Sequence, residues 1–166
     1  MKLQNGSDVR GVAIAGVPGE DVTLVPEAVN RIAAGFAKFL AKKLNKQTSD
    51  LRIAVGHDSR VSAGMMKEAV FGGLLGQGVH VTDCGLASTP AMFMSIIFED
   101  THMDGSIMIT ASHLPYNRNG LKFFTVDGGL EKSEVKEVLT LASGLSAMAV
   151  SSAAIASLDL IDRSEE

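Results

Sequence analysis

Leu51-Arg52-Ile53-Ala54-Val55-Gly56 is a short apolar run that predicts a buried β-strand, and the residues after it decide the fold class. Apolar side chains recur at helical spacing over residues 63–77, and Gly78 is a typical helix stop. A second apolar run at residues 79–83 predicts the next strand. Strand, helix and strand in this order are typical of α/β proteins.

The same alternation continues on both sides of this unit. Further strands are expected at residues 9–15, 105–110 and 121–126, and further helices at residues 26–46, 90–98 and 134–143. Ser133 is the predicted N-cap of the last helix and Gly144 its stop. We therefore expect an α/β fold, a three-layer helix-sheet-helix domain whose mixed, mainly parallel sheet has about four strands.

The length of the chain predicts one folded domain. Its 166 residues suit a single core, which we expect in residues 1–145. Residues 146–166 are rich in Ala and Ser, and we expect them to form a tail or linker toward a missing second domain. On this interpretation, the surface against which the tail docks is missing from the chain.

Composition argues against two classes of partner. Hydrophobic residues make up 46% of the chain and the mean hydropathy is +0.21, yet no continuous apolar run is long enough to cross a bilayer. The net charge is −4 and the basic residues are scattered, which argues against nucleic-acid binding. We expect neither a membrane nor a nucleic acid as partner.

Cysteine content and the N-terminus indicate the compartment. The single Cys84 cannot form an internal disulfide, which favours a reducing compartment, cytoplasmic or plastid-type. Residues 1–6 lack the apolar core of a secretory signal and the Arg and Ser content of a transit peptide. We expect no signal or transit peptide in this chain.

Residues 112–122, with the sequence SHLPYNRNGLK, carry the best candidate for chemistry. They follow a predicted strand, and ligands of open α/β sheets gather at the carboxyl ends of strands. Ser112 offers a nucleophile, His113 an imidazole and Lys122 a cation or proton acceptor, while Gly120 gives the loop backbone freedom. The alternative is a surface loop in which His113 is merely solvated and Lys122 is an ordinary lysine at a strand edge.

Two smaller clusters contain an acid beside an arginine. Asp58 and Arg60 follow another predicted strand, where Asp58 could orient Arg60 toward a phosphate or tie this loop to the Ser112 loop. The alternative is that Asp58 or Ser59 simply caps the following helix. Asp8 and Arg10, considered alone, are an exposed ion pair that contributes little.

Other enzyme classes are disfavoured by missing motifs. No G-x-S-x-G surrounds Ser112, so an α/β-hydrolase is disfavoured, and no nucleotide-binding glycine motif follows a strand. The four histidines lack zinc-like spacing.

Taken together, the clusters resemble the α-D-phosphohexomutases, the phosphoglucomutase and phosphomannomutase superfamily. The resemblance covers most of the chain, as an N-terminal domain only. It rests on T-A-S-H-L-P at residues 110–115 with N-G-L-K at residues 119–122, G-H-D-S-R-V-S at residues 56–62, D-V-R-G at residues 8–11 and G-L-A-S-T-P at residues 85–90.

The resemblance implies a phosphoryl-transfer cycle between hexose 1-phosphate and hexose 6-phosphate. Ser112 would carry the phosphoryl group, Lys122 would act as acid or base and His113 would assist. Residues implied to organise the phosphate pocket are Arg10, Asp58, Arg60, Asn119 and Gly120. The resemblance also implies a sugar phosphate as substrate and Mg²⁺ as cofactor, bound through the phosphate on Ser112 with its remaining ligands outside this chain.

The chain departs from the family pattern in two ways. Leu114 replaces the usual Asn after the Ser-His pair, so either the loop is held differently or substrate choice differs. The D-G-D-G-D metal loop and the sugar- and phosphate-recognition segments of other family domains do not occur in these 166 residues. We therefore expect negligible turnover by the isolated chain. A non-catalytic binding or regulatory module with the same fold is the alternative.

Overall fold

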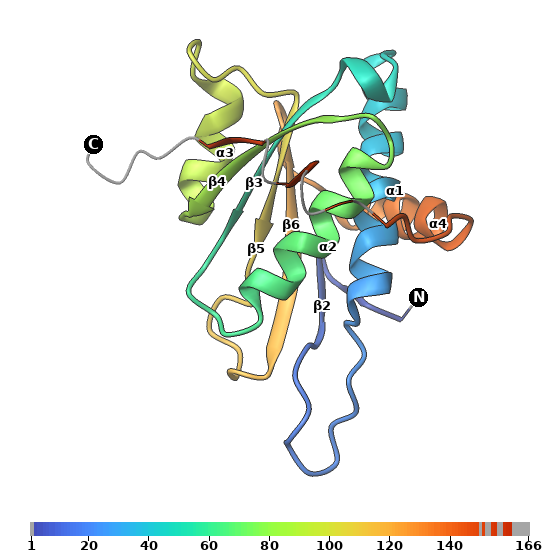
Figure 1. The fold of residues 1–166 in the computed structure, drawn as a ribbon, viewed down its shortest axis with the longest axis vertical. Coiled ribbons are helices and arrows are strands. Elements are labelled where there is room, and N and C mark those ends of the chain that lie inside the picture. Colours follow the sequence, from blue (N-terminus) through green and yellow to red (C-terminus); the bar gives the residue numbers. More distant parts are fainter. Residues whose placement is uncertain (1, 150, 152–153, 156–157, 161–166) are drawn as a thin grey trace.

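The predicted strand-helix-strand unit lies at the centre of the fold (Figure 1). The computed structural model describes residues 2–149, 151, 154–155 and 158–160. In it, β3 (Arg52–His57) leads into α2 (Ala63–Leu75) and then into β4 (His80–Leu86). Strand β3 pairs in parallel with β4 on one side and with β5 (Gly105–Ile109) on the other.

The remaining elements extend this unit on both sides. They are β1 (Gln4–Asn5), β2 (Asp8–Val12), β6 (Arg118–Thr125), β7 (Gly128–Gly129) and β8 (Asp159–Leu160), with helices α1 (Pro26–Leu44), α3 (Thr89–Ile97), α4 (Lys132–Ser143) and the short 3-10 helix η1 (Thr48–Asp50). The described strands form one sheet in the order β1-β2-β6-β5-β3-β4-β8, with β7 paired to β6.

The prediction of a mixed α/β sheet between helices is confirmed, but the sheet is larger than expected. It has eight strands among the described residues instead of about four, and β1, β7 and β8 each have only two residues. Pairs β1–β2, β2–β6, β5–β6 and β6–β7 are antiparallel, so the parallel part is confined to β5, β3, β4 and β8. Two-residue strands lack a periodic apolar pattern, which is why the sequence did not reveal them.

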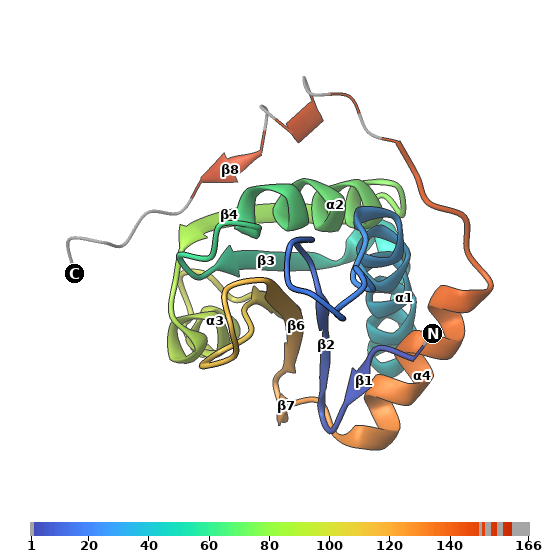
Figure 2. The same cartoon turned by 90° about the horizontal axis from the view of Figure 1, so that it is seen from below.

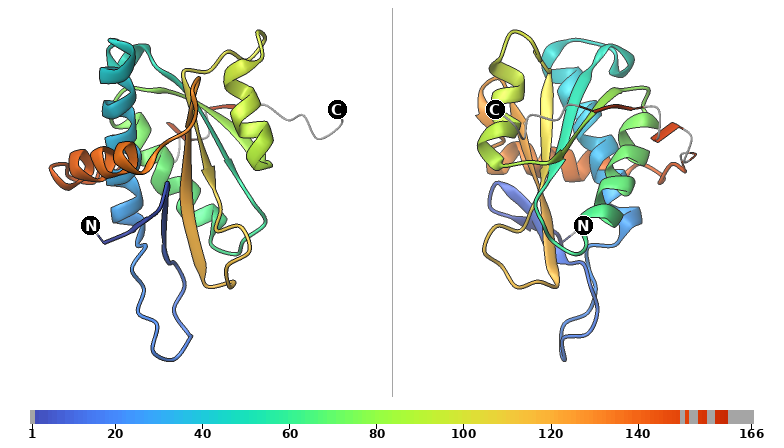
Figure 3. Two further views of the ribbon diagram at one scale, coloured as in Figure 1. Left: turned by 180° about the vertical axis from the view of Figure 1, so that it is seen from behind. Right: turned by 60° about the vertical axis from the view of Figure 1, so that its left-hand side comes forward.

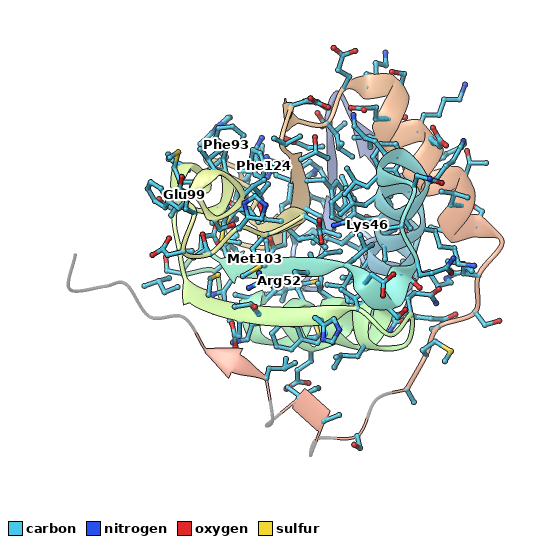
Figure 4. All side chains as sticks on the ribbon, turned by 90° about the horizontal axis from the view of Figure 1, so that it is seen from above. Lys46, Arg52, Phe93, Glu99, Met103 and Phe124 are labelled. Carbon is cyan, nitrogen blue, oxygen red and sulfur yellow. The ribbon has the colours of Figure 1, made fainter. Side chains whose placement is uncertain are left out.

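Alternating side chains of the strands pack into two separate hydrophobic cores. Ile53 and Val55 of β3 join the larger core beneath α1, α2 and α4, whereas Ala54 joins a smaller core beneath α3. Figure 2 shows α2 and α3 on opposite sides of β3. On the α3 side, Phe93 of α3 lies against Phe124 of β6 with ring centroids 6.2 Å apart (Figure 4).

Several predicted boundaries need correction, among them the end of the first strand, which lies at Val12 rather than at residue 15. Strand β6 begins at Arg118 rather than at residue 121, so the second half of the predicted loop belongs to a strand. The N-cap of α4 is Glu131 rather than Ser133, because Glu131 and Glu134 form a reciprocal capping box. Helix α2 ends at Leu75 with Gly76 as its C-cap, earlier than the predicted stop at Gly78, whose φ of +78° belongs to the turn before β4.

The C-terminal strap, residues 145–149, has a docking surface within this chain, which corrects that part of the expectation. The side chain of Asn30 on α1 pairs with both main-chain groups of Met148, at 2.9 Å each. Gly76, directly after α2, leaves room for the Met148 side chain, since a Cβ there would lie 2.7 Å from it. Of the predicted tail, residues 150, 152–153, 156–157 and 161–166 lie outside the described residues.

Within the described part of the chain, no helix combines the length and the apolar character that spanning a membrane requires.

Candidate active site

Three loops lie at one end of the sheet (Figure 3), and two of them carry clusters found in the sequence. Residues 58–62 follow β3 and residues 110–117 follow β5, and these two strands are parallel. Residues 13–25 follow β2, which also runs parallel to β5 because both strands are antiparallel to β6. The carboxyl ends of parallel strands lie at one edge of a sheet, which brings the three loops together.

Arg60 ties the loop of residues 110–117 to the loop after β3. Its guanidinium donates hydrogen bonds to four main-chain carbonyls of that loop and of the start of β6, those of Ser112 (2.9 Å), Leu114 (2.7 Å), Pro115 (2.8 Å) and Arg118 (2.9 Å). Arg60 was expected either to face a phosphate or to tie the two loops together. The geometry supports the tie between the loops, because both terminal nitrogens donate to carbonyls. It also explains how the loop is held with Leu114 in place of Asn, since the contacts of Arg60 with this loop are to main-chain atoms only.

Asp58 connects Arg60 to the strand that precedes Ser112. Its Oδ1 accepts the main-chain N–H of Arg60 at 3.1 Å, and its Oδ2 lies 3.3 Å from Arg60 Nε. Oδ2 also accepts the hydroxyl of Thr110 at 2.6 Å. Thr110 was not singled out in the sequence, because a threonine at the end of a strand is a common β-former with no chemical signature of its own.

Ser112 has an unusual backbone conformation. Its φ is +56°, in the left-handed region that costs a residue with a Cβ roughly 1–2 kcal/mol. Its N–H donates to the Thr110 hydroxyl at 2.8 Å, and its side chain is exposed. The neighbouring His113 is also exposed, and it forms no hydrogen bond or ion pair with any residue that the structure describes.

Lys122 lies on β6, not on the loop, and pairs with Asp8 of β2. Its Nζ contacts both carboxylate oxygens of Asp8, at 3.0 and 2.9 Å. Arg10 donates to Asp8 Oδ2 at 2.9 Å and to the carbonyl of Thr110 at 2.5 Å. These side chains are partly buried, so the two cations are held at fixed positions around one carboxylate.

Gly120 is required for close packing rather than for backbone freedom, which corrects the reason given from the sequence. It pairs with Arg10 across β2 and β6, and it does not have a positive φ. A Cβ at this position would clash with the carbonyl oxygen of Val9 and would lie 2.7 Å from Arg10 Cδ. Because Gly120 has no side chain, Arg10 can lie across β6 toward the loop.

Asn119 is a structural residue within this arrangement. It is fully buried, donates to Ser62 Oγ at 2.8 Å and accepts the Gly120 N–H at 2.8 Å. It therefore fastens β6 to the loop before α2 and does not line the pocket described below.

A pocket of about 360 Å³ lies beside Ser112. It is lined by Asn5, Asp8, Arg10, Ala111, Ser112, His113, Leu114 and Lys122. The hydroxyl, the imidazole and the lysine of residues 112–122 thus share one cavity with Arg10, which belongs to a separate motif. A phosphoryl group on Ser112 would lie beside a guanidinium and an ammonium, which are suitable partners for its charge.

Glu20 adds a contact that sequence reasoning missed. It accepts a hydrogen bond from Asn117 at 2.9 Å and pairs with Arg118 at 3.1 Å, which links the loop after β2 to the loop before β6. The hydrogen bond from Asn117 and the neighbouring Arg118 lower the pKa of the Glu20 carboxyl below its ordinary value. No motif identified Glu20, because its partners are far away in the sequence.

The residues of this pocket do not by themselves fit a divalent metal. Among the described residues, no group of three or more His, Cys, Asp or Glu side chains could hold a metal ion. Both oxygens of Asp8 are engaged by cations. Ser112 would supply one oxygen, directly or through a phosphate, and a magnesium site needs several.

Comparison with known proteins gives concordant matches. Residues 1–144 match the family described as phosphoglucomutase/phosphomannomutase, alpha/beta/alpha domain I. The phosphoglucosamine mutase of Nautilia profundicola is 39% identical over 137 residues, which cover 82% of this chain and 28% of that protein. The phosphoglucosamine mutase of Lactiplantibacillus plantarum is 32% identical over 143 residues, which cover 84% of this chain and 30% of that protein.

A solved structure assigned as a phosphomannomutase from Thermus thermophilus has the same fold. Its TM-score is 0.72 at 25% identity, and the match covers 98% of this chain and 33% of that one. The chain thus spans about three tenths of the length of the curated relatives cited above.

Proposed function

The chain belongs to the phosphoglucomutase/phosphomannomutase family as its α/β/α domain I, and from this premise we propose that it carries the phosphoryl group of a phosphohexomutase on Ser112. The reaction would interconvert a hexose 1-phosphate and a hexose 6-phosphate. This chain would supply the phosphoserine, and further domains of the kind found in its longer relatives would complete the site.

The pocket beside Ser112 is the observation that supports this proposal. An exposed hydroxyl faces a cavity whose other polar groups include Arg10 and Lys122. In the transfer from phosphoserine, the bond between Ser112 Oγ and phosphorus breaks while a sugar hydroxyl bonds to phosphorus and passes its proton to the imidazole of His113, which lines the same pocket. Charge that develops on the phosphoryl oxygens would be stabilised by fixed cations, which need no reorganisation during the step.

Lys122 is the candidate proton donor to the oxygen that leaves. Its Nζ lies 3.0 and 2.9 Å from the two carboxylate oxygens of Asp8, which fix its position beside the pocket. When the second phosphate of the sugar returns to Ser112, the same group in reverse takes the serine proton. His113 lines the pocket and would assist by taking the proton of the attacking sugar hydroxyl and returning it to the sugar oxygen that leaves in the second transfer.

The substrate class is a hexose phosphate. The relatives are named phosphoglucosamine mutase and phosphomannomutase, and the described residues of this chain do not distinguish between these sugars. Mg²⁺ is part of the proposal at the level of the family, with the Ser112 phosphate as its one ligand from this chain. No step above depends on it.

A domain-exchange experiment tests the proposal. Residues 1–144 of this chain would replace the matching first segment of the Nautilia profundicola phosphoglucosamine mutase, and the mutase activity of the purified chimera would be measured. We expect measurable turnover, and loss of it by at least about a hundredfold in Ser112→Ala. Circular dichroism of both forms would establish that they are equally folded.

Two outcomes would contradict the proposal. Equal turnover of the chimera with and without the Ser112 hydroxyl would mean that another group carries the phosphate. A folded chimera with no turnover and no phosphate on Ser112 would support the alternative of a non-catalytic module.

A further inference from the structure

We propose that Thr110 is a positioning residue for Ser112, which it holds in the left-handed backbone conformation that turns the serine hydroxyl toward the pocket. This inference rests on the proposed function, because it concerns the residue to which that function assigns the phosphoryl group. It assigns to Thr110 a role that neither its position at the end of β5 nor the pocket lining indicates.

A hydrogen bond to Thr110 holds the Ser112 N–H. Thr110 Oγ1 accepts this N–H at 2.8 Å, and its own proton goes to Asp58 Oδ2 at 2.6 Å. Because the proton of the hydroxyl is committed to a carboxylate, a lone pair of Oγ1 is oriented toward Ser112. A hydroxyl that donates to a charged acceptor is also held more firmly than one that contacts a neutral group.

The main-chain carbonyl of Ser112 is also held by a side chain that Asp58 contacts. The Ser112 carbonyl accepts a hydrogen bond from Arg60 at 2.9 Å, and Arg60 in turn donates its own N–H to Asp58 Oδ1 at 3.1 Å. Asp58 therefore orients one contact on each side of the Ser112 Cα. Two peptide groups fixed in this way define the φ and ψ of the serine between them.

The backbone conformation of Ser112 is one that requires such contacts. Ser112 has a φ of +56°. A residue with a Cβ is unfavourable in this region and stays there only when the surrounding structure holds it. If the Thr110 hydroxyl were absent, the Ser112 N–H would lose its partner and the serine could relax toward ordinary φ values. Its side chain would then no longer have a fixed direction relative to the pocket.

Thr110 also contacts Arg10, one of the two cations of the pocket. The main-chain carbonyl of Thr110 accepts a hydrogen bond from Arg10 at 2.5 Å. Thr110 thus contacts the serine through its hydroxyl and the nearest guanidinium through its carbonyl. Because Thr110 is only 4% exposed, it can hold both groups from within the fold.

Three variants separate positioning from stability. Thr110→Val removes the hydroxyl at nearly constant volume, Thr110→Ser retains it, and Ser106→Ala removes a different buried hydroxyl of β5, which donates to the Met92 carbonyl at 2.6 Å. Amide hydrogen exchange at Ser112 would be measured by NMR on the whole chain. Phosphate uptake from glucose 1,6-bisphosphate with Mg²⁺ would be measured by peptide mass spectrometry, as a rate and a half-saturating concentration.

We expect exchange at Ser112 to be about fivefold faster in Thr110→Val, the effect of losing one hydrogen bond, and near the original rate in the other two variants. We expect the maximal rate of phosphate uptake to fall about 10- to 100-fold in Thr110→Val with little change in the half-saturating concentration, and to recover in Thr110→Ser.

Unchanged exchange in a folded Thr110→Val would overturn the inference, as would faster exchange with an unchanged maximal rate. If Thr110→Val does not fold, Thr110→Ser decides: a loss of uptake in this variant that exceeds the loss in Ser106→Ala contradicts the role given to the hydroxyl. If even the unsubstituted chain takes up no phosphate, phosphoryl acceptance by the isolated chain is contradicted, while the exchange rates still decide the role of Thr110.

Discussion

At Ser112 the proposed chemistry and the stability of the chain make opposite demands. A nucleophile needs a side chain, whereas a φ of +56° is easiest for a residue without one. The hydrogen bonds from Arg60 and to Thr110 maintain the strained conformation. Strained residues that the surrounding structure holds in place are found preferentially at functional sites.

Replacing Ser112 with Gly should therefore stabilise the fold. We expect the free energy of unfolding to rise by about 1 kcal/mol, because the steric cost of the Cβ is removed. Ser112→Ala loses the same hydroxyl but keeps the Cβ, so it should leave the stability nearly unchanged. Urea unfolding of the three forms would measure the difference, and equal stability of the Gly and Ala variants would argue against strain at this residue.

Gly120 should be intolerant of even one added carbon. Gly120→Ala brings a Cβ against the Val9 carbonyl and within 2.7 Å of Arg10 Cδ, so we expect a loss of about 2–3 kcal/mol. Gly64, in α2, provides the matched control because a Cβ there meets nothing within 4 Å, and alanine there should stabilise the helix by up to ~1 kcal/mol. Thermal unfolding would compare them, and an equally stable Gly120→Ala would show that β2 and β6 can separate at no cost.

At the scale of elements, the long periodic segments could be predicted and the short ones could not. Helix α1 extends over Pro26–Leu44, and the sequence located it because Pro26 and a long apolar face mark it unambiguously. Strand β6 starts at Arg118, earlier than predicted. The prediction placed the start too late because Asn119 and Gly120, considered without their partners, are typical of turns. Their fit to Ser62 and Arg10 becomes visible only in the folded chain.

The same limit applies to the candidate site. Motif spacing identified Ser112, Arg10 and Lys122, which share one pocket. It gave no role to Thr110, although this residue lies in the motif of residues 110–115, and it did not identify Glu20. The importance of both residues lies in hydrogen bonds to specific partners and not in their residue type. Chemically distinctive side chains are thus accessible from sequence, whereas the groups that orient them require the fold.

The packing of α4 should depend on pH through Glu134. Burial alone would raise the pKa of Glu134, but its hydrogen bonds with Lys43 and with the Glu131 N–H outweigh burial, so this pKa lies below its ordinary value. The stabilisation is therefore present above the pKa of an unfolded glutamate, ~4.3, and is lost as pH falls through the lower folded value. We expect Glu134→Gln to flatten the loss of stability below this pH.

Glu137→Gln is the control for this effect. Glu137 pairs with an exposed lysine, Lys42, whose side chain is 75% accessible, and such a pair contributes little to stability. Urea unfolding between neutral and acidic pH should therefore be nearly unchanged by Glu137→Gln. If Glu134→Gln retains the full acid dependence of the original chain, the contact with Lys43 has no energetic importance.

At the scale of the whole molecule, the strap of residues 145–149 is part of the folded unit. Asn30 is 7% exposed, and both its donor and its acceptor engage Met148. A chain that ends at residue 145 should fold but lose about 1–3 kcal/mol, because it leaves the buried amide without these partners. In the shortened chain Asn30→Ala should cost much less than in the full chain, and independent costs in urea unfolding would contradict this coupling.

The larger claim is that one end of this domain holds a phosphoryl carrier for a site completed elsewhere. The pocket brings Ser112 together with Arg10 and Lys122, and the family to which the chain belongs supports assigning this pocket to phosphoryl transfer. Site-resolved mass spectrometry of the chimera during turnover tests the claim most directly. The account predicts a phosphoryl group on Ser112, gained and lost with the reaction. Sustained turnover with Ser112 unmodified throughout would contradict it.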